Sequence, residues 1–283
     1  MQLVERSWYP KLKYAVYLLL AFNVLVFFRQ EWLAAEHLFD TTIPLSELII
    51  AFAASIDTLA WLILLLLFEL ETFQIPDDKL TPNLLRSIHS VRALCYAVIA
   101  YSFYGYLTKA LGMNAYVLQE TLDACKLGAA DWSLMIKQDE FRTLTADNCK
   151  PSIAGDQLYA LADNSTAVYD SVLQKVKQLS WVNVINSGTW LLVVALLELD
   201  VRLGVYNRVG DAWKAFSKWA KYIAYAILFA AAVYWGFEGD FIDFWDAFLW
   251  LFAFAFIELN VTEWRDELQA QPQDLLEGES QDA

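Results

Sequence analysis

The chain has 283 residues, of which 58% are hydrophobic and 16% aromatic, and its mean hydropathy is +0.36. Such a composition excludes an ordinary soluble domain, which has to cover its surface with polar side chains, and predicts an integral membrane protein. The formal net charge of -14 argues against nucleic acid as a partner. Much of that charge lies in residues 263–283, which we expect to form a solvated, disordered cytoplasmic tail.

Six apolar segments predict six membrane-spanning helices, at residues 14–28, 48–70, 90–108, 182–199, 222–237 and 241–259. Several are shorter than the roughly 20 residues that cross a bilayer, and flanking Trp and Tyr would extend them through the interface. A cleaved signal peptide is the alternative for the first segment, which Asn23 interrupts. Lys13 and Tyr17 at the start of this segment belong to the repeat described next, which favours a retained helix.

A motif recurs at the end of the second, fourth and sixth segments. In each copy Trp is followed eight residues later by Glu and then Leu, and Asp or Asn precedes the Trp by four residues. The copies are Asp57, Trp61, Glu69 and Leu70; Asn186, Trp190, Glu198 and Leu199; and Asp246, Trp250, Glu258 and Leu259. The segment before each copy opens with a basic residue and, four places on, a Tyr: Lys13 and Tyr17, Arg92 and Tyr96, Lys221 and Tyr225.

Repetition of both halves predicts three helical hairpins, at about 11–71, 82–200 and 211–260. The expected fold is all-α, with a six-helix membrane domain over residues 1–260 and pseudo-threefold organisation. Lysine and arginine are concentrated in the segments that this plan places on the side of both termini. The charge bias therefore predicts a bacterial inner-membrane protein with cytoplasmic termini.

Residues 112–180 interrupt the second hairpin, and we call this insertion the cap. Cys125 and Cys149 both fall in it, so an oxidising compartment outside the cytoplasm predicts a disulfide between them, with two unrelated free thiols as the alternative. Cys95 lies in the third span and is interpreted as a packing residue. Asp163 or Asn164 would begin a helix that runs into the fourth span.

Residues 208–220 predict a separate helix on the inner membrane surface. This segment combines Trp213, Phe216 and Trp219 with Arg208, Lys214 and Lys218. Aromatic and basic residues in one short helix suit contact with anionic membrane lipid.

Asp57, Asn186 and Asp246 are candidates for a solute or ion site, because an ionisable group inside a span is costly unless it faces a partner or a cavity. A hydrogen-bonded layer that locks the helices is the equally weighted alternative. Asn23 and Tyr101 or Ser102 should lie at the same depth. Trp61, Trp190 and Trp250 recur at the same depth of their helices. Such aromatic residues usually pack between helices or anchor them at the membrane interface. A cation site against the faces of their rings is the alternative.

The repeated basic residue and Glu should meet at the cytoplasmic boundary of each hairpin. The expected pairs are Lys13 with Glu69, Arg92 with Glu198 and Lys221 with Glu258. They would form either three ion pairs that lock helix ends or a ring of carboxylates that acts as a cytoplasmic gate.

Several classes of enzyme are excluded by missing motifs. The chain has two histidines, no Cys and His cluster with metal-ligand spacing, and no phosphate-binding glycine loop. We therefore expect no metal and no cofactor. The leading hypothesis is movement or binding of a small ion or solute between the repeats. The alternative is a non-catalytic membrane subunit that binds a protein partner, or another copy of itself, through the cap or the cytoplasmic face. The third is an intramembrane enzyme that uses Asp57 and Asp246.

Overall fold

The structure, a computed structural model, describes residues 9–38, 45–70, 81–120, 124–127, 132–161, 165–205, 210–238, 241–254 and 256. These residues are mostly helical. They form two compact units, one of the described residues up to 22 and from 232 onward, and one of the described residues between 23 and 231. The acidic tail and the proposed gate residue Glu258 lie outside the described residues.

Apart from a turn at Phe52, every predicted apolar segment is helical wherever it is described. The helices are α1 (Tyr9–Leu38), α2 (Leu45–Ala51), α3 (Ala53–Glu69), α4 (Pro82–Gly112), α6 (Asp170–Val205), α7 (Asp211–Glu238) and a helix over 241–254. The segments Pro10–His37, Asp170–Asp200 and Ala215–Glu238 are long and apolar enough to cross a membrane. In their most apolar stretches 33%, 33% and 28% of the residues are buried within the protein. Most residues of these stretches are therefore not buried within the protein, and apolar side chains such as Leu18, Leu25 and Phe229 are exposed, as in a membrane protein.

The predicted second span, 48–70, is divided into α2 and α3 at Phe52. Its φ of -116° and ψ of 34° leave the helical region and interrupt the helix. Phe52 is buried, and its ring stacks on Phe28 of α1 with centroids 5.5 Å apart. The break frees the first N–H groups of α3 for other acceptors.

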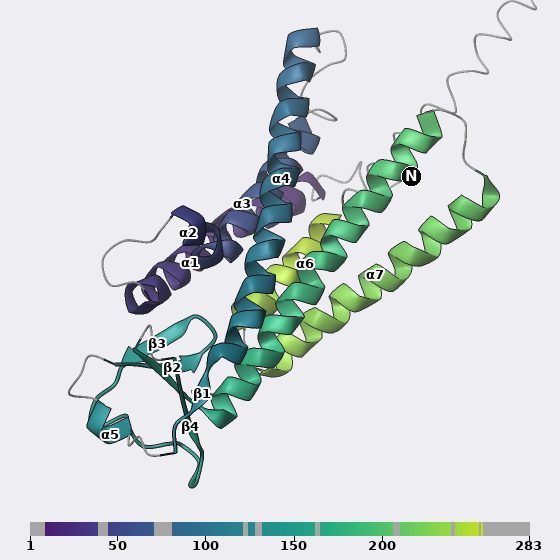
Figure 1. Cartoon of the computed structure of the whole chain (residues 1–283). Coiled ribbons are helices and arrows are strands. Elements are labelled where there is room, and N and C mark those ends of the chain that lie inside the picture. The colour runs from purple at the N-terminus through teal and green to yellow at the C-terminus, as the bar shows by residue number, and fades with distance from the viewer. Residues whose placement is uncertain are drawn as a thin grey trace, which may run out of the picture. The chain divides into compact units, whose positions relative to one another are not determined.

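Helix α4 packs against both α3 and α6 in the larger unit (Figure 1). Glycine permits two of these close approaches. A Cβ on Gly105 would lie 3.1 Å from the Ile49 carbonyl oxygen, and one on Gly188 would lie 3.2 Å from the Phe103 ring.

The cap contains a five-stranded sheet, which the all-α prediction missed. Its order is β1-β4-β5-β2-β3, with β2 and β5 parallel and the other neighbours antiparallel. The strands are β1 (Val117–Leu118), β2 (Ser133–Lys137), β3 (Glu140–Thr143), β4 (Leu158–Leu161) and β5 (Thr166–Tyr169). A short helix, α5 (Ala124–Leu127), and the single turn η3 (Met113–Ala115) complete it.

The helix expected from Asp163 or Asn164 begins later, at Asp170. Both of those residues lie outside the described part of the chain, and Val168, which fits the helical spacing, is a buried residue of β5. Asp156 accepts hydrogen bonds from the Ser171 N–H at 3.2 Å and its hydroxyl at 2.6 Å. These bonds satisfy donors of the first turn and fix where α6 starts.

The predicted disulfide between Cys125 and Cys149 is confirmed, with Cα atoms 4.8 Å apart, and Cys95 is a free, buried thiol. The bond closes over a core that contains Leu134, Leu144 and Tyr169. Burial also raises the pKa of the Tyr116 phenol at the junction of α4 and the cap.

Candidate functional site

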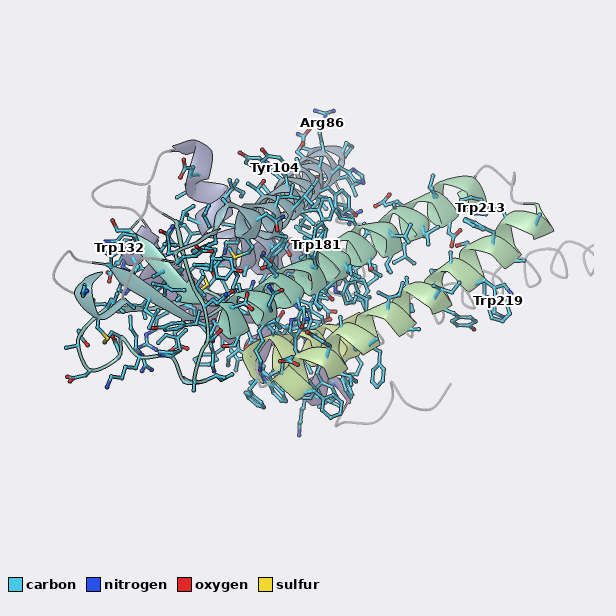
Figure 2. The ribbon with its side chains drawn as sticks, turned by 60° about the horizontal axis from the view of Figure 1, so that its bottom comes forward. Arg86, Tyr104, Trp132, Trp181, Trp213 and Trp219 are labelled. Atoms are coloured by element: carbon cyan, nitrogen blue, oxygen red, sulfur yellow. A yellow bond between two sulfur atoms is a disulfide. The ribbon has the colours of Figure 1, made fainter. Side chains whose placement is uncertain are left out.

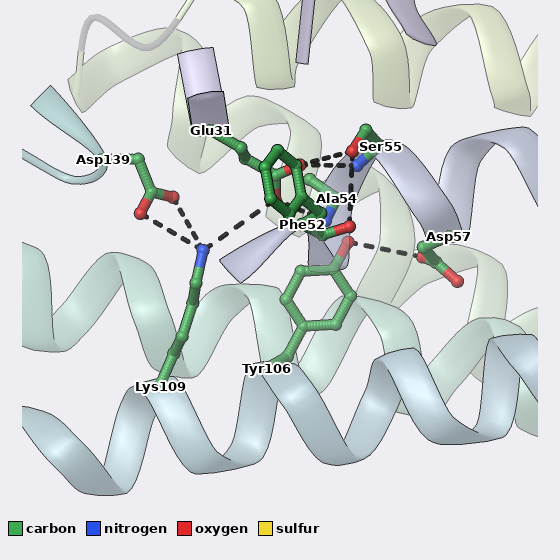
Figure 3. A network of polar contacts seen from close by, with 8 residues as sticks. All are labelled: Glu31, Phe52, Ala54, Ser55, Asp57, Tyr106, Lys109 and Asp139. Carbon is green, nitrogen blue, oxygen red and sulfur yellow. Dashed lines mark hydrogen bonds and ion pairs between the residues drawn. The ribbon is translucent and has the colours of Figure 1, made fainter. Parts of the chain in front are cut away.

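Asp57 lies in α3 and is buried, with 9% of its surface exposed. The Tyr106 hydroxyl of α4 donates a hydrogen bond to Asp57 Oδ2 at 3.4 Å (Figure 3). Asn23 of α1 and Ser102 of α4, expected at the same depth, are buried as well. The structure therefore contains buried polar side chains where the sequence predicts a polar layer.

The helix register brings members of this layer to one level. Along α4, Tyr96 contacts Glu198 and Phe103 contacts Gly188, so α4 and α6 are antiparallel. Tyr106 likewise meets Asp57. Counting along α4 and α6 from these contacts puts Ser102, Asn186 and Ser187 within about one helical turn, roughly 6 Å, along the helix axes. The bond from Tyr106 ties Asp57 to the same part of α4. We call these four the polar layer: Asp57, Ser102, Asn186 and Ser187.

Several polar atoms of this region are buried and have no hydrogen-bond partner among the described residues. They include Ser102 Oγ, Asn186 Oδ1 and Ser187 Oγ, and one turn nearer the cap Asn183 Oδ1. A buried polar group without a partner costs about 1–3 kcal/mol, so such groups usually bind water or a ligand. Their convergence on one level of α4 and α6 marks a candidate binding site.

Two of the repeated tryptophans meet. The rings of Trp61 and Trp190 lie 6.1 Å apart at an interplanar angle of 57°, and both residues are buried. Trp250 is also buried and packs on Phe254, 6.4 Å away, in the smaller unit. Asp246 lies on the same helix, partly exposed.

One buried carboxylate with several hydrogen bonds, Glu31, was missed by sequence reasoning. Glu31 of α1 is 2% exposed and occupies the start of α3 just after the helix break. It accepts hydrogen bonds from the Ala54 N–H at 2.7 Å, the Ser55 N–H at 3.0 Å and the Ser55 hydroxyl at 2.6 Å (Figure 3). The positive end of the helix dipole and these donors stabilise the buried charge.

Lys109 links this carboxylate to the cap. Its Nζ lies 3.9 Å from Glu31 Oε1 and 3.2 Å from both carboxylate oxygens of Asp139, in the turn between β2 and β3. Asp139 has φ 55°, a left-handed conformation that Asp tolerates better than most residues. A second link joins His37 Nδ1 of α1 to Ser133 Oγ of β2 at 2.9 Å. We call Glu31, Ser55, Lys109 and Asp139 the Glu31 network.

A signal for Glu31 exists in the sequence. Asn23, Phe27, Glu31 and Ala34 recur at spacings of four, four and three, and all are buried on one face of α1. Ending the first span at residue 28 placed Glu31 in a loop, although the helix continues to Leu38. The break at Phe52 has no such signal, since neither Pro nor Gly accompanies it.

The predicted pairs of basic residue and Glu have mixed outcomes. Glu198 Oε1 accepts a hydrogen bond from the Tyr96 hydroxyl at 2.8 Å, one turn from Arg92, and the ion pair with Arg92 stays a prediction. Lys221 Nζ lies 3.0 Å from Asp200 Oδ2, and its predicted partner Glu258 lies outside the described residues. Lys13 and Glu69 are each buried, and their pairing stays a prediction.

The available ligands are oxygen atoms of carboxylates, hydroxyls and amides. Such atoms replace the hydration shell of a hard cation or bind a polar solute. Among the residues that the structure describes, no group of three or more His, Cys, Asp or Glu side chains is arranged to hold a metal ion.

Comparisons with protein-family models, with curated proteins and with solved structures give no match. The chain's function is therefore argued from its own residues.

Proposed function

We propose that the protein binds a small cation or polar solute at the polar layer and passes it across the membrane. In this proposal all six helical segments cross the membrane as three hairpins, and Asp246 with Trp250 is the third copy of the site. The proposal extends to a cytoplasmic gate formed by the repeated basic residues and glutamates.

The observation that carries the proposal is the set of buried polar atoms without a hydrogen-bond partner. Ser102 Oγ, Asn186 Oδ1 and Ser187 Oγ come from two helices. Asp57 is bonded to Tyr106, about one turn along α4 from Ser102. A lipid-embedded protein whose only need is to lock helices would pair these groups with one another. Unpaired acceptors and hydroxyls near a buried carboxylate instead suit a transient, partly hydrated ligand.

The Glu31 network lies at the cap end of the same helices. Because Lys109 is about one turn from Tyr106 on α4, the network would close the path on that side. Asn183 would then continue the path from the polar layer toward the cap.

Asp57→Asn in reconstituted liposomes tests the proposal. Purified protein is inserted into vesicles, and entry of Na⁺, K⁺ and H⁺ is followed with ion-sensitive dyes. We expect flux of at least one ion in the wild type and a loss of about tenfold or more in Asp57→Asn, because the amide keeps the shape and removes the charge. Asn186 at the equivalent repeat position indicates that an amide fits there.

Asp147→Asn is the matched control, since Asp147 is an exposed carboxylate in the cap. It should leave flux unchanged. A polar solute rather than an ion would show as a rise in thermal stability on adding that solute, lost in Asp57→Asn. Unchanged flux and unchanged solute response in Asp57→Asn, together with poor folding of Asp57→Leu, would show that the layer is structural.

The second candidate is a membrane subunit that binds a protein partner through the cap. The observation in its favour is that the cap is fixed by a disulfide and by the contacts of Lys109 and His37 with the sheet. A rigid, anchored sheet suits docking. This candidate would replace the first if a defined partner co-purifies from native membranes and Asp57→Asn changes no measured flux.

A further inference from the structure

Helix α7 has two chemically different faces at its start. Trp213, Ser217 and Lys221 recur every four residues and all bond to Asp200 of α6. The distances to its carboxylate oxygens are 2.9 Å from the Trp213 indole nitrogen, 2.6 Å from the Ser217 hydroxyl and 3.0 Å from Lys221 Nζ. This face fixes the rotation of α7 about its axis.

The opposite face is aromatic, apolar and exposed. Phe216, Trp219, Tyr222 and Ile223 expose 58%, 65%, 55% and 60% of their surfaces. Figure 2 shows Trp213 directed toward α6 and Trp219 directed away from it. The predicted surface helix at 208–220 and the span at 222–237 are one continuous helix from Asp211, so these aromatic side chains lie where the apolar stretch Ala215–Glu238 begins.

Lys218 gives this face a positive charge. Residues 212–237 contain three lysines and no Asp or Glu. Lys221 is held by Asp200, whereas Lys218 is exposed, and the described ion pairs do not include it. Lys218 Nζ lies 5.8 Å from the centroid of the Tyr222 ring, and the Trp219 and Tyr222 rings meet edge to face at 6.0 Å. An ammonium group, an indole N–H and a phenol are thus grouped at one place.

We propose that the surface formed by Phe216, Lys218, Trp219, Tyr222 and Ile223 binds the headgroup of an anionic phospholipid. The lipid phosphate pairs with Lys218 and accepts hydrogen bonds from Trp219 and Tyr222. Phe216 and Ile223 contact the acyl chains, and the lysine stem extends along the apolar surface while its charge reaches the headgroups. The cationic charge selects an anionic lipid over a zwitterionic one, because a basic residue is attracted to the negative charge of the headgroup.

Native mass spectrometry of the full chain in a mild detergent tests this inference. Equal amounts of dioleoyl-phosphatidylglycerol and dioleoyl-phosphatidylcholine are added, so that only the headgroup differs. The wild type should retain phosphatidylglycerol in preference. Lys218→Gln should weaken this retention about fivefold, and Lys218→Arg should preserve it.

Trp181→Ala is the matched control for Trp219→Ala, because Trp181 is an exposed tryptophan on α6 near the cap (Figure 2). Trp219→Ala should reduce retention of phosphatidylglycerol, and Trp181→Ala should leave it unchanged. The Cys125–Cys149 disulfide and an unchanged elution volume report correct folding. If Lys218→Gln fails to fold, the wild type and Lys218→Arg still test the inference, because both should prefer phosphatidylglycerol to phosphatidylcholine.

Equal retention of the two lipids by the wild type would overturn the inference, as would equal losses in the two tryptophan variants. A dimer that Trp219→Ala converts to a monomer would assign the surface to a second copy of the chain. Neither result bears on ion flux, so the lipid surface and the proposed solute path fail or stand separately.

Discussion

Replacing Glu31 by Gln tests whether the Glu31 network holds the membrane helices together. The side chain keeps nearly the same size, but one carboxylate oxygen becomes an amide group that donates hydrogen bonds. Donors of Ala54 and Ser55 surround the site at 2.6–3.0 Å, so the new amide faces donors and leaves at least one of them unpaired. Lys109 keeps Asp139 as a partner at 3.2 Å and loses the charge of Glu31.

The expected loss of unfolding free energy is about 2–4 kcal/mol. A buried donor left without a partner costs about 1–3 kcal/mol, and hydrogen bonds to a charged group contribute about 1.5–3 kcal/mol each. The amide oxygen in Glu31→Gln still accepts one hydrogen bond, so the loss of unfolding free energy should be smaller than when the whole side chain is removed. Removing the side chain in Glu31→Ala should cost about 3–5 kcal/mol, as expected when one partner of a buried charge pair is lost.

The measurement is reversible unfolding in mixed micelles, with sodium dodecyl sulfate as the denaturant and helical circular dichroism as the signal. Glu36→Gln is the control, because Glu36 lies on the same helix and is exposed. Its free energy should stay within about 0.5 kcal/mol of the wild type. If Glu31→Gln is no more destabilising than Glu36→Gln, the network does not hold α1 against α3.

Three further outcomes are expected. Without reductant, peptide mapping should recover Cys125 linked to Cys149. Replacing both by Ser should lower the free energy of unfolding by about 3 kcal/mol in the chain-entropy model. Two freely alkylated thiols would refute the disulfide. Tyr96→Phe should cost about 1 kcal/mol in the wild type and almost nothing in a Glu198→Leu background, where the acceptor of the 2.8 Å bond is already gone. An equal cost in both backgrounds would show that the two residues do not interact. Gly105→Leu should lower the free energy of unfolding by about 1–3 kcal/mol or more, because the larger side chain overpacks against α2 and α3. Gly105→Ala should lower it less. A Leu variant as stable as the wild type would contradict the close contact.

The positions of the apolar helices could be predicted from the sequence because hydropathy is a local property. Apart from the turn at Phe52, the six predicted segments are helical where the structure describes them. Their ends were less predictable, since α1 and α6 extend well past the apolar stretch into residues such as Arg29 and Lys175. A helix can continue beyond its apolar core whenever its polar residues find water or a partner.

The cap sheet was missed because its strands are only two to five residues long. Strands β1 and β4 pair across some forty residues, a distance that no local pattern reveals. The cysteine pair gave the one long-range constraint that sequence alone supplies here, and the structure contains that bond.

The broken helix was missed for a related reason. Phe52 carries no helix-breaking side chain, and its conformation depends on partners far along the chain. Glu31, twenty-one residues earlier, binds the N–H groups that the break exposes, and Phe28 stacks on the Phe52 ring. Such a break is stable only in the folded protein, where a buried carboxylate replaces the lost intrahelical acceptors.

In the proposed function two buried carboxylates have different tasks: Glu31 holds the fold, and Asp57 serves a ligand. Glu31 accepts three short hydrogen bonds, which hold α1 against the start of α3. Asp57 is bonded to Tyr106 of α4, and Ser102 and Asn186 have buried oxygen atoms with no described partner. If this division holds, Glu31→Gln lowers stability in proportion to its lost bonds, while Asp57→Asn removes flux and keeps most of the stability. A protein in which both variants lose stability equally and neither changes flux would have a polar centre built only to join helices, because in lipid such contacts take over much of the role that hydrophobic burial has in water.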